Sequence, residues 1–154
     1  MTLNELVTKQ NILSALRVKE GEKELPRALK IKIVRLLMAY KKARTQMDEE
    51  IQEFAKNLIP EDIKTLQNKP EDKRTDEEKK TLEDAIKKAN EDYTEFVNQK
   101  AAEEVNGTFD DTFTEEDFDE IIDINVGLET TINNQPVSSE ELVEAFYNLF
   151  VNKK

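Results

Sequence analysis

A heptad pattern in the first half of the chain constrains its fold more than any other feature. From residue 27 to residue 58, mostly apolar side chains recur at alternating spacings of four and three. This spacing predicts one long helix with a seam that packs against another helix. Pro26 suits the first turn of that helix, where its missing N–H is not needed. The predicted seam consists of Ile33, Leu37, Tyr40, Arg44, Met47, Ile51, Phe54 and Leu58.

A second helix with the same spacing is predicted over residues 76–105. Thr75 and Glu78 form a capping-box pattern at its start. Two such helices joined by a tether predict a long antiparallel, coiled-coil-like hairpin. The pattern leaves open whether the two seams meet within one chain or between chains. The second seam consists of Leu82, Ile86, Ala89, Tyr93, Phe96 and Lys100.

Shorter elements are predicted around these long helices. Thr2 and Glu5 form a capping box ahead of a helix over residues 3–17. Residues 18–26 are a charged connection that can form a turn or a short hairpin. A short helix is predicted over residues 60–68, after the first long helix ends.

The end of the chain predicts a small α+β lobe. The pair Asn106-Gly107 is expected to cap the second long helix, and Thr114 with Asp117 resembles the start of a short helix. The β-branched stretches IIDINV and LETTIN can pair as a small hairpin. The turn sequence NNQP then precedes a terminal helix over residues 139–151.

The composition fits an elongated helical protein. Of 154 residues, 37% are apolar and 37% are charged, which is too polar for a thick globular interior. We therefore expect a mainly α fold. The short N-terminal helix and the long hairpin would occupy residues 1–105. The acidic C-terminal lobe, residues 106–154, would pack on or beside them, giving one domain overall.

The chain lacks the residue types on which most catalytic and metal sites depend. It contains no His and no Cys, which removes the commonest general base, the usual nucleophile–base pairs and Cys-ligated metals. No signal peptide, glycine-rich phosphate loop or apolar run of about 20 residues is recognisable. We expect a non-enzymatic cytoplasmic protein without catalytic residues, cofactor or metal.

Charge is divided unevenly along the chain, whose net charge is −11. Residues 9–44 carry a net charge of +8, and residues 101–152 carry a net charge of −14. Such a division predicts association with charged partners and says little about the fold. The two regions can attract each other within one chain or between neighbouring copies.

The basic residues of the first long helix form one candidate protein-interaction site. Nucleic acid is the alternative partner, but the negative overall charge and the lack of aromatic residues between the basic ones disfavour it. Arg44 also lies in the predicted seam, where a charge can set register or partner choice. The candidate basic site comprises Arg27, Lys30, Arg35, Lys41 and Arg44.

The stretch DDTFTEEDFDEIID, residues 110–123, carries eight carboxylates in fourteen residues. It lacks the glycine of an EF-hand loop, and nothing predicts the apolar pocket that a catalytic acid needs. A solvated surface and a docking surface for a basic partner remain as interpretations. The phenylalanines would anchor that partner or form the region's own core. The candidate acidic and aromatic site comprises Asp110, Asp111, Phe113, Glu115, Glu116, Asp117, Phe118 and Asp119.

The order of these parts resembles a family of small, largely uncharacterised proteins of tailed bacteriophages. In that family a short N-terminal helix, here NELVTKQNILSAL, precedes a basic segment, here LPRALKIKIVRLL. A long helical hairpin, an acidic stretch, here FDEIIDINV, and a terminal apolar helix, here EELVEAFYNLF, follow. Arg27 and Lys30 fall where the family places basic residues. The resemblance implies a virion or assembly component of the head–tail region that acts by protein contacts.

Together these features predict a structural or assembly protein in the host cytoplasm or in a virion. Its expected partners are other copies of itself or other virion proteins, and no membrane is involved. The alternative is an adaptor or regulatory module that binds one protein partner through the acidic, Phe-bearing surface. Residue types do not encode the identity of the partner or the oligomeric state.

Overall fold

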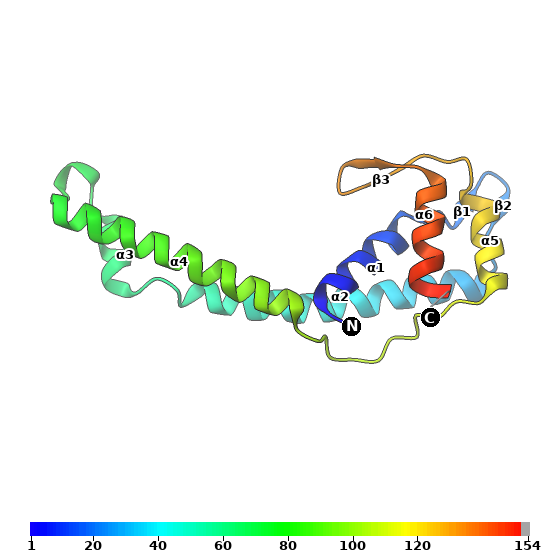
Figure 1. Cartoon of the computed structure of the whole chain (residues 1–154), viewed down its shortest axis with the longest axis horizontal. Helices are drawn as coiled ribbons and strands as arrows, with labels where there is room; N and C mark the ends of the chain where they lie inside the picture. Colours follow the sequence, from blue (N-terminus) through cyan, green and yellow to red (C-terminus); the bar gives the residue numbers. More distant parts are fainter. Residues whose placement is uncertain (152–154) are drawn as a thin grey trace. The chain divides into compact units, whose positions relative to one another are not determined.

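The computed structural model describes residues 1–151, which are mainly helical with two short antiparallel hairpins (Figure 1). In chain order the elements are α1 (Leu3–Ala15), β1 (Lys19–Glu20), β2 (Lys23–Glu24), α2 (Arg27–Lys56), α3 (Glu61–Asn68), the 3-10 turn η1 (Glu71–Lys73), α4 (Asp76–Ala102), α5 (Glu115–Asn125), β3 (Thr130–Ile132), β4 (Gln135–Val137), α6 (Ser139–Phe146) and the π-helical turn η2 (Tyr147–Val151).

The chain forms two compact units. Unit 1 combines residues 1–44 with the residues from 105 onward, and unit 2 comprises residues 45–104. We expected a boundary at residue 105, with the N-terminal helix grouped with the hairpin, whereas the residues from 105 onward share a unit with residues 1–44. One edge of unit 2 falls inside α2, so the first part of that helix belongs to unit 1 and its last part to unit 2.

Local capping chemistry accounts for the starts of three helices. The predicted capping boxes of Thr2 and Thr75 are confirmed, and the helix start predicted at Thr114 is a capping box as well. In each box the threonine side chain and the acidic residue three positions later are bonded reciprocally to backbone N–H groups. The charged connection after α1 forms the short hairpin of β1 and β2, as its sequence allowed.

The buried seam of α2 differs from the predicted seam by one position in two places. Leu36 and Ala43 are buried where Leu37 and Arg44 were predicted, while Ile33, Tyr40 and Met47 are buried as expected. Arg44 is exposed and donates a hydrogen bond to Gln10. The spacing of four and three is preserved with a small apolar residue at 43, so no guanidinium has to leave water. The buried side chains of α2 are Leu29, Ile33, Leu36, Tyr40, Ala43 and Met47.

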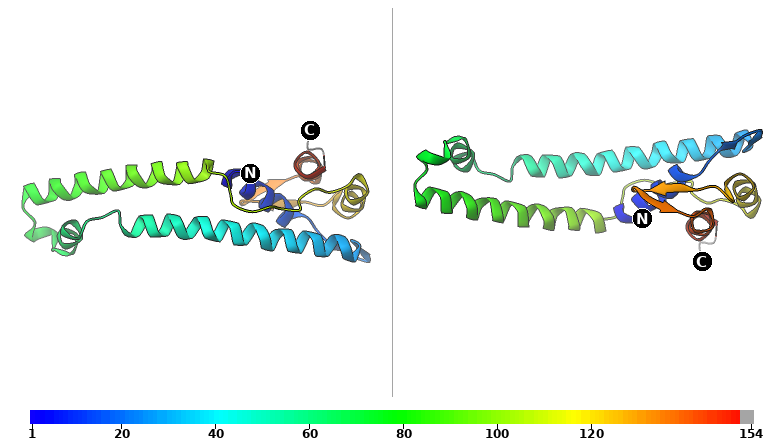
Figure 2. Two further views of the ribbon diagram at one scale, coloured as in Figure 1. Left: turned by 90° about the horizontal axis from the view of Figure 1, so that it is seen from below. Right: turned by 90° about the horizontal axis from the view of Figure 1, so that it is seen from above.

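Within unit 2, the last part of α2 lies beside α4 (Figure 2). The rings of Phe54 and Phe96 stack with their centroids 3.9 Å apart. Lys100, which ends the predicted second seam, forms ion pairs with Glu50 and with Glu103. A lysine can occupy this half-buried position because carboxylates receive its ammonium while its methylene groups pack.

The predicted α4 seam is only partly buried. Leu82 is 7% exposed, but Ile86 and Tyr93 are 36% and 41% exposed. Helix α4 also ends at Ala102, with Glu103 as its C-cap. The predicted cap at Asn106-Gly107 is therefore wrong, because the helix ends several residues earlier.

The C-terminal hairpin uses one of the two predicted strands, because β3 lies within the stretch LETTIN. Residues 121–125 belong to α5, where Ile121, Ile124 and Asn125 are buried on one helical face. The hairpin instead pairs β3 with β4. Its turn is formed by Asn133 and Asn134, whose φ angles are +52° and +63°. Asparagine tolerates this left-handed conformation, which two-residue hairpin turns require.

Aromatic residues from distant parts of the sequence form the core of unit 1. Phe113 contacts Phe146 and Phe150 edge to face, with ring centroids 5.1 Å and 5.7 Å apart. The backbone N–H of Phe113 donates to the carbonyl of Phe150 at 2.9 Å. The segment that precedes α5 is thus packed against the terminal helix, which continues from α6 into η2.

A buried carboxylate lies beside this core. Asp111 is 7% exposed and accepts hydrogen bonds from the Lys9 ammonium at 2.7 Å and from the Tyr40 hydroxyl at 3.1 Å. The Lys9 ammonium also lies 5.6 Å from the centre of the Phe150 ring. This cluster joins α1, α2, the segment before α5 and the terminal helix.

Replacing Asp111 with alanine is expected to lower the free energy of unfolding by about 3 kcal/mol, because it leaves the Lys9 ammonium largely buried without its carboxylate. The control is Asp123→Ala, which removes an ion pair with Lys23 whose side chains are more than 60% exposed. It is expected to cost less than about 1 kcal/mol. Urea unfolding followed by circular dichroism measures both losses, and equal losses would contradict the importance assigned to Asp111.

Replacing Phe96 with alanine is expected to destabilise unit 2 by about 2 kcal/mol, because the stacked contact with Phe54 and its buried apolar area are lost. Tyr93→Ala, one turn earlier on α4, serves as the control and should cost about 0.5 kcal/mol or less. Hydrogen exchange of the α4 amides measures the difference. A larger loss of protection in Tyr93→Ala would refute this packing.

Candidate functional site

Two residues of the predicted acidic and aromatic site lie in the interior of unit 1. The Asp111 carboxylate accepts hydrogen bonds from Lys9 and Tyr40, and Phe113 is only 2% exposed. The prediction that these two residues belong to a docking surface is therefore corrected. Phe113 belongs to the region's own core because its ring packs on Phe146 and Phe150 of the terminal helix and its N–H donates to the carbonyl of Phe150.

Three further residues of that site have contacts within the fold. Asp117 accepts the backbone N–H of Thr114 as half of the α5 capping box. Glu115 accepts the hydroxyl of Tyr147 at 2.6 Å, and this hydrogen bond raises the pKa of Tyr147. Phe118 is half-buried and its ring lies 4.8 Å from that of Tyr147.

The remaining members of the acidic site are on the surface. Asp110 is exposed and lies 3.8 Å from the Lys32 ammonium. Glu116 and Asp119 are exposed on α5, as is the adjacent Glu120. Within residues 1–151, no ion pair engages these three α5 carboxylates.

The described part of the chain contains no group of three or more acidic side chains placed to hold a metal ion. The carboxylates of the acidic stretch instead point to different places. Asp111 forms a buried ion pair, Asp117 caps α5, and others lie on the exposed face of that helix. A metal site needs several oxygen ligands that converge on one point. We therefore assign no metal ligand in this stretch.

Burial changes the acidity of Tyr40. Its side chain is fully buried, and desolvation together with the neighbouring Asp111 charge raises the pKa of the hydroxyl far above its ordinary value of 10.0. Both causes disfavour a phenolate, since a second negative charge would form in the interior beside the first. Tyr40 therefore acts as a neutral hydrogen-bond donor to Asp111.

The raised pKa of Tyr40 predicts a loss of stability at high pH. Above pH 10 the unfolded chain releases this proton and the folded chain does not, so unfolding becomes more favourable as pH rises. Between pH 10 and pH 11, the free energy of unfolding should fall about 1 kcal/mol more in the wild type than in Tyr40→Phe. Other groups that titrate in this range are common to both proteins. Parallel stability curves would contradict the prediction.

The basic residues of the predicted site lie along α2. Arg27, Arg35 and Lys41 are exposed, and no ion pair reaches them from the described residues. Lys30 is half-buried and pairs with Glu24. Arg44 lies beyond this group and is hydrogen-bonded to Gln10 of α1. Three of the predicted basic residues therefore form no ion pair among the described residues, and the other two already have partners within unit 1.

An exposed apolar stripe runs among these cations, and sequence reasoning missed it. Ile31, Val34 and Met38 are 37%, 53% and 66% exposed and follow one another at helical spacing. They lie outside the heptad seam, so the four-and-three spacing does not include them. The detectable signal was that residues 27–38 carry apolar side chains on nearly every side of the helix, which indicates a second contact.

The stripe and its cations form one surface, which we call the exposed α2 face. Its members all belong to α2, so they form an open helix face and not an enclosed pocket, and three of them are basic. Charged rims around an apolar centre are typical of protein–protein interfaces. The exposed α2 face comprises Arg27, Lys30, Ile31, Val34, Arg35 and Met38.

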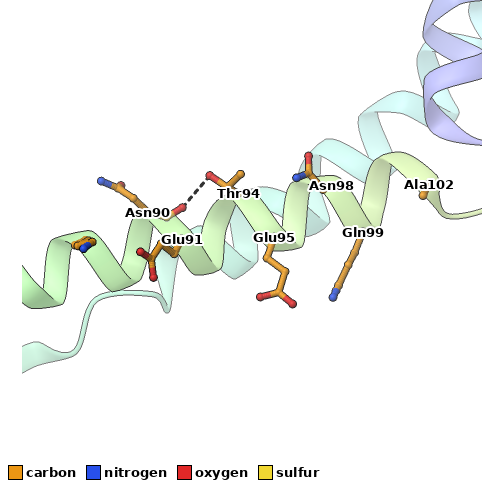
Figure 3. A pocket seen from close by; sticks show the side chains of 8 residues that line it. Asn90, Glu91, Thr94, Glu95, Asn98, Gln99 and Ala102 are labelled. Atoms are coloured by element: carbon orange, nitrogen blue, oxygen red, sulfur yellow. Dashed lines mark hydrogen bonds between the residues drawn. The ribbon is translucent and has the colours of Figure 1, made fainter.

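A hollow lies along α4 in unit 2 (Figure 3). All eight residues that line it come from this one helix, and the Thr94 hydroxyl donates to the Asn90 carbonyl of the same helix at 2.9 Å. Ligand sites bury most of their ligand between convergent walls. A face built by a single helix does not do so, and we assign it no chemistry.

Comparisons with protein families, with curated proteins and with solved structures find no match for this chain. Among the described helices, none is both long enough and apolar enough to cross a membrane.

Proposed function

We propose that this chain is a non-enzymatic structural or assembly protein that binds other proteins through the exposed α2 face. The observation that carries the proposal is the stripe of Ile31, Val34 and Met38, which stays open to water between cations. Exposed apolar side chains grouped on one face are a common feature of interaction sites. The absence of His and Cys from the sequence supports a role without catalysis.

We further propose that α2 and α4 form an antiparallel, coiled-coil-like hairpin in unit 2. The stacked Phe54 and Phe96 and the ion pair of Glu50 with Lys100 support this arrangement. Ile86 and Tyr93 remain partly exposed on α4, so part of the second seam stays open to water.

The biological context that we propose is a tailed bacteriophage. It rests on the resemblance in the order of parts, from the short N-terminal helix to the terminal apolar helix. The protein would act in the bacterial host cytoplasm during assembly, or as a component of the virion at the head–tail region. Its partners would be copies of itself or other virion proteins.

The alternative adaptor function receives no specific support. It requires an acidic surface with phenylalanine anchors, yet Phe113 is buried in the core and Phe118 packs on Tyr147. Asp111 is likewise occupied within the fold. Phe113 and Phe118 therefore do not serve as the exposed phenylalanine anchors that this function requires.

The double variant Val34→Asp, Met38→Asp tests the proposed function. Two carboxylates in the centre of the stripe should prevent apolar burial and reduce association with copies or virion proteins by about tenfold or more, while the fold persists because both residues are exposed. The measurement is the number of copies retained in purified particles and assembly intermediates, by quantitative mass spectrometry.

The control for this test is Tyr93→Asp, which places the same charge on an exposed apolar residue of α4. It should leave retention through the exposed α2 face unchanged. Equal retention of the wild type and the double variant would show that the exposed α2 face is not the binding surface. Complete absence of the wild type from particles and intermediates would refute the assembly function.

A further inference from the structure

We propose that the exposed α2 face of one copy binds the acidic face of α5 on a second copy. The inference rests on the proposed function, since it names the partner of the same surface. We define the acidic face of α5 by the exposed carboxylates that form no ion pair among residues 1–151 and by apolar residues near them. It comprises Glu116, Asp119, Glu120, Ile122 and Val126. Asp123 lies on the same side of the helix and is exposed, but it already pairs with Lys23.

The acidic face has the spacing of a single helix surface. Glu116, Asp119 and Glu120 are separated by three and four residues and therefore lie on one side of α5. Ile122 is half-buried, and Val126 at the end of the helix is 52% exposed. The face thus offers carboxylates along its first turns and apolar side chains near its end.

The two faces are complementary in charge. Arg27 and Arg35 border the apolar stripe of α2, and Lys41 follows one turn after Met38. Neither these cations nor the three α5 carboxylates form an ion pair within residues 1–151. Opposite charges left unpaired on two exposed helices steer those helices toward each other when copies meet.

The two faces are also similar in length. The α2 face from Arg27 to Lys41 extends about 21 Å and α5 about 16 Å, at 1.5 Å per residue. Ile31, Val34 and Met38 would contact Ile122 and Val126, while the arginines meet the carboxylates. A contact of this size is small for a stable interface, so we expect it to be weak and sensitive to salt.

We place the contact between different copies. Both faces are exposed, and among residues 1–151 no ion pair or hydrogen bond connects them. Two α2 faces would not pair with each other, because Arg27 and Arg35 would then meet like charges. The contact is therefore head to tail, and it repeats from copy to copy into a closed ring or an open chain.

Charge reversal on each face separately tests the inference. The first variant is Arg27→Glu, Arg35→Glu on α2, and the second is Asp119→Lys, Glu120→Lys on α5. Light scattering after size exclusion measures the mass of each full-length protein and of their equal mixture, at about 50 mM and about 500 mM salt. Circular dichroism establishes that both variants keep the helical content of the wild type.

The wild type should associate at the lower salt concentration and dissociate at the higher one. Each variant alone should associate about tenfold or more weakly, because its two faces carry the same sign. The mixture should recover association, because each reversed face meets an opposite face on the other variant. A monomeric wild type, or a mixture that does not recover, would overturn the inference.

This failure is distinguishable from failure of the proposed function. If the wild type is monomeric but particles retain it through Val34 and Met38, the exposed α2 face binds another protein and only the second-copy inference is wrong. If the double variant at those positions is retained like the wild type, the proposed function of the face fails as well.

A cross-linking experiment on the unaltered protein guards against misfolded variants. Equal amounts of ¹⁴N-labelled and ¹⁵N-labelled wild type are treated with a zero-length carbodiimide reagent, which joins lysines to carboxylates in contact. Mixed-isotope links of Lys30 or Lys41 to Glu116 or Glu120 are expected. Links at these positions that carry one isotope only would place the contact within a chain and overturn the inference.

Discussion

The fold of unit 1 depends on the burial of one carboxylate. An ionised side chain that leaves water must receive charge and hydrogen bonds in return, or the cost exceeds the stability of a small domain. Asp111 receives them from Lys9 on α1 and Tyr40 on α2. Because these partners come from the first third of the chain, the interaction brings both ends of the chain into one unit.

This anchor also determines what the rest of the acidic stretch can do. With Asp111 and Phe113 held in the interior, α5 begins at the edge of the core and presents Glu116, Asp119 and Glu120 to solvent. Carboxylates that are neighbours in the acidic stretch therefore have different roles. One balances a buried lysine, one caps a helix, and the exposed group remains available to a basic surface.

Helix α2 has two apolar sides, and the basic residues surround the exposed one. One side, from Leu29 to Met47, is buried in the fold. The other side carries Ile31, Val34 and Met38 among cations and remains open. A helix that needed only one neighbour would expose charged residues at these positions. The same element can therefore hold unit 1 together and bind outside it.

Local rules predicted much of the secondary structure and little of the site. The long helices and the capping boxes of Thr2 and Thr75 follow from local contacts along the chain, so their sequence signals suffice. Residues 121–125 were predicted as a strand because β-branched residues cluster there, but packing of Ile121 and Ile124 on one helical face prevails. At Arg44 the α2 seam lies one position from its prediction, because burying Ala43 costs less desolvation free energy than burying a guanidinium.

The residue sequence alone established a mainly helical chain with a basic and an acidic region, because periodicity, caps and charge are local properties. The tertiary structure decided which charges are buried and which remain exposed. The partners of Asp111 lie 71 and 102 residues away, at Tyr40 and Lys9. No local pattern specifies such pairings, since they arise only when distant segments compete for the same interior space. The side chains that remain exposed after this packing form the surface that a partner can bind.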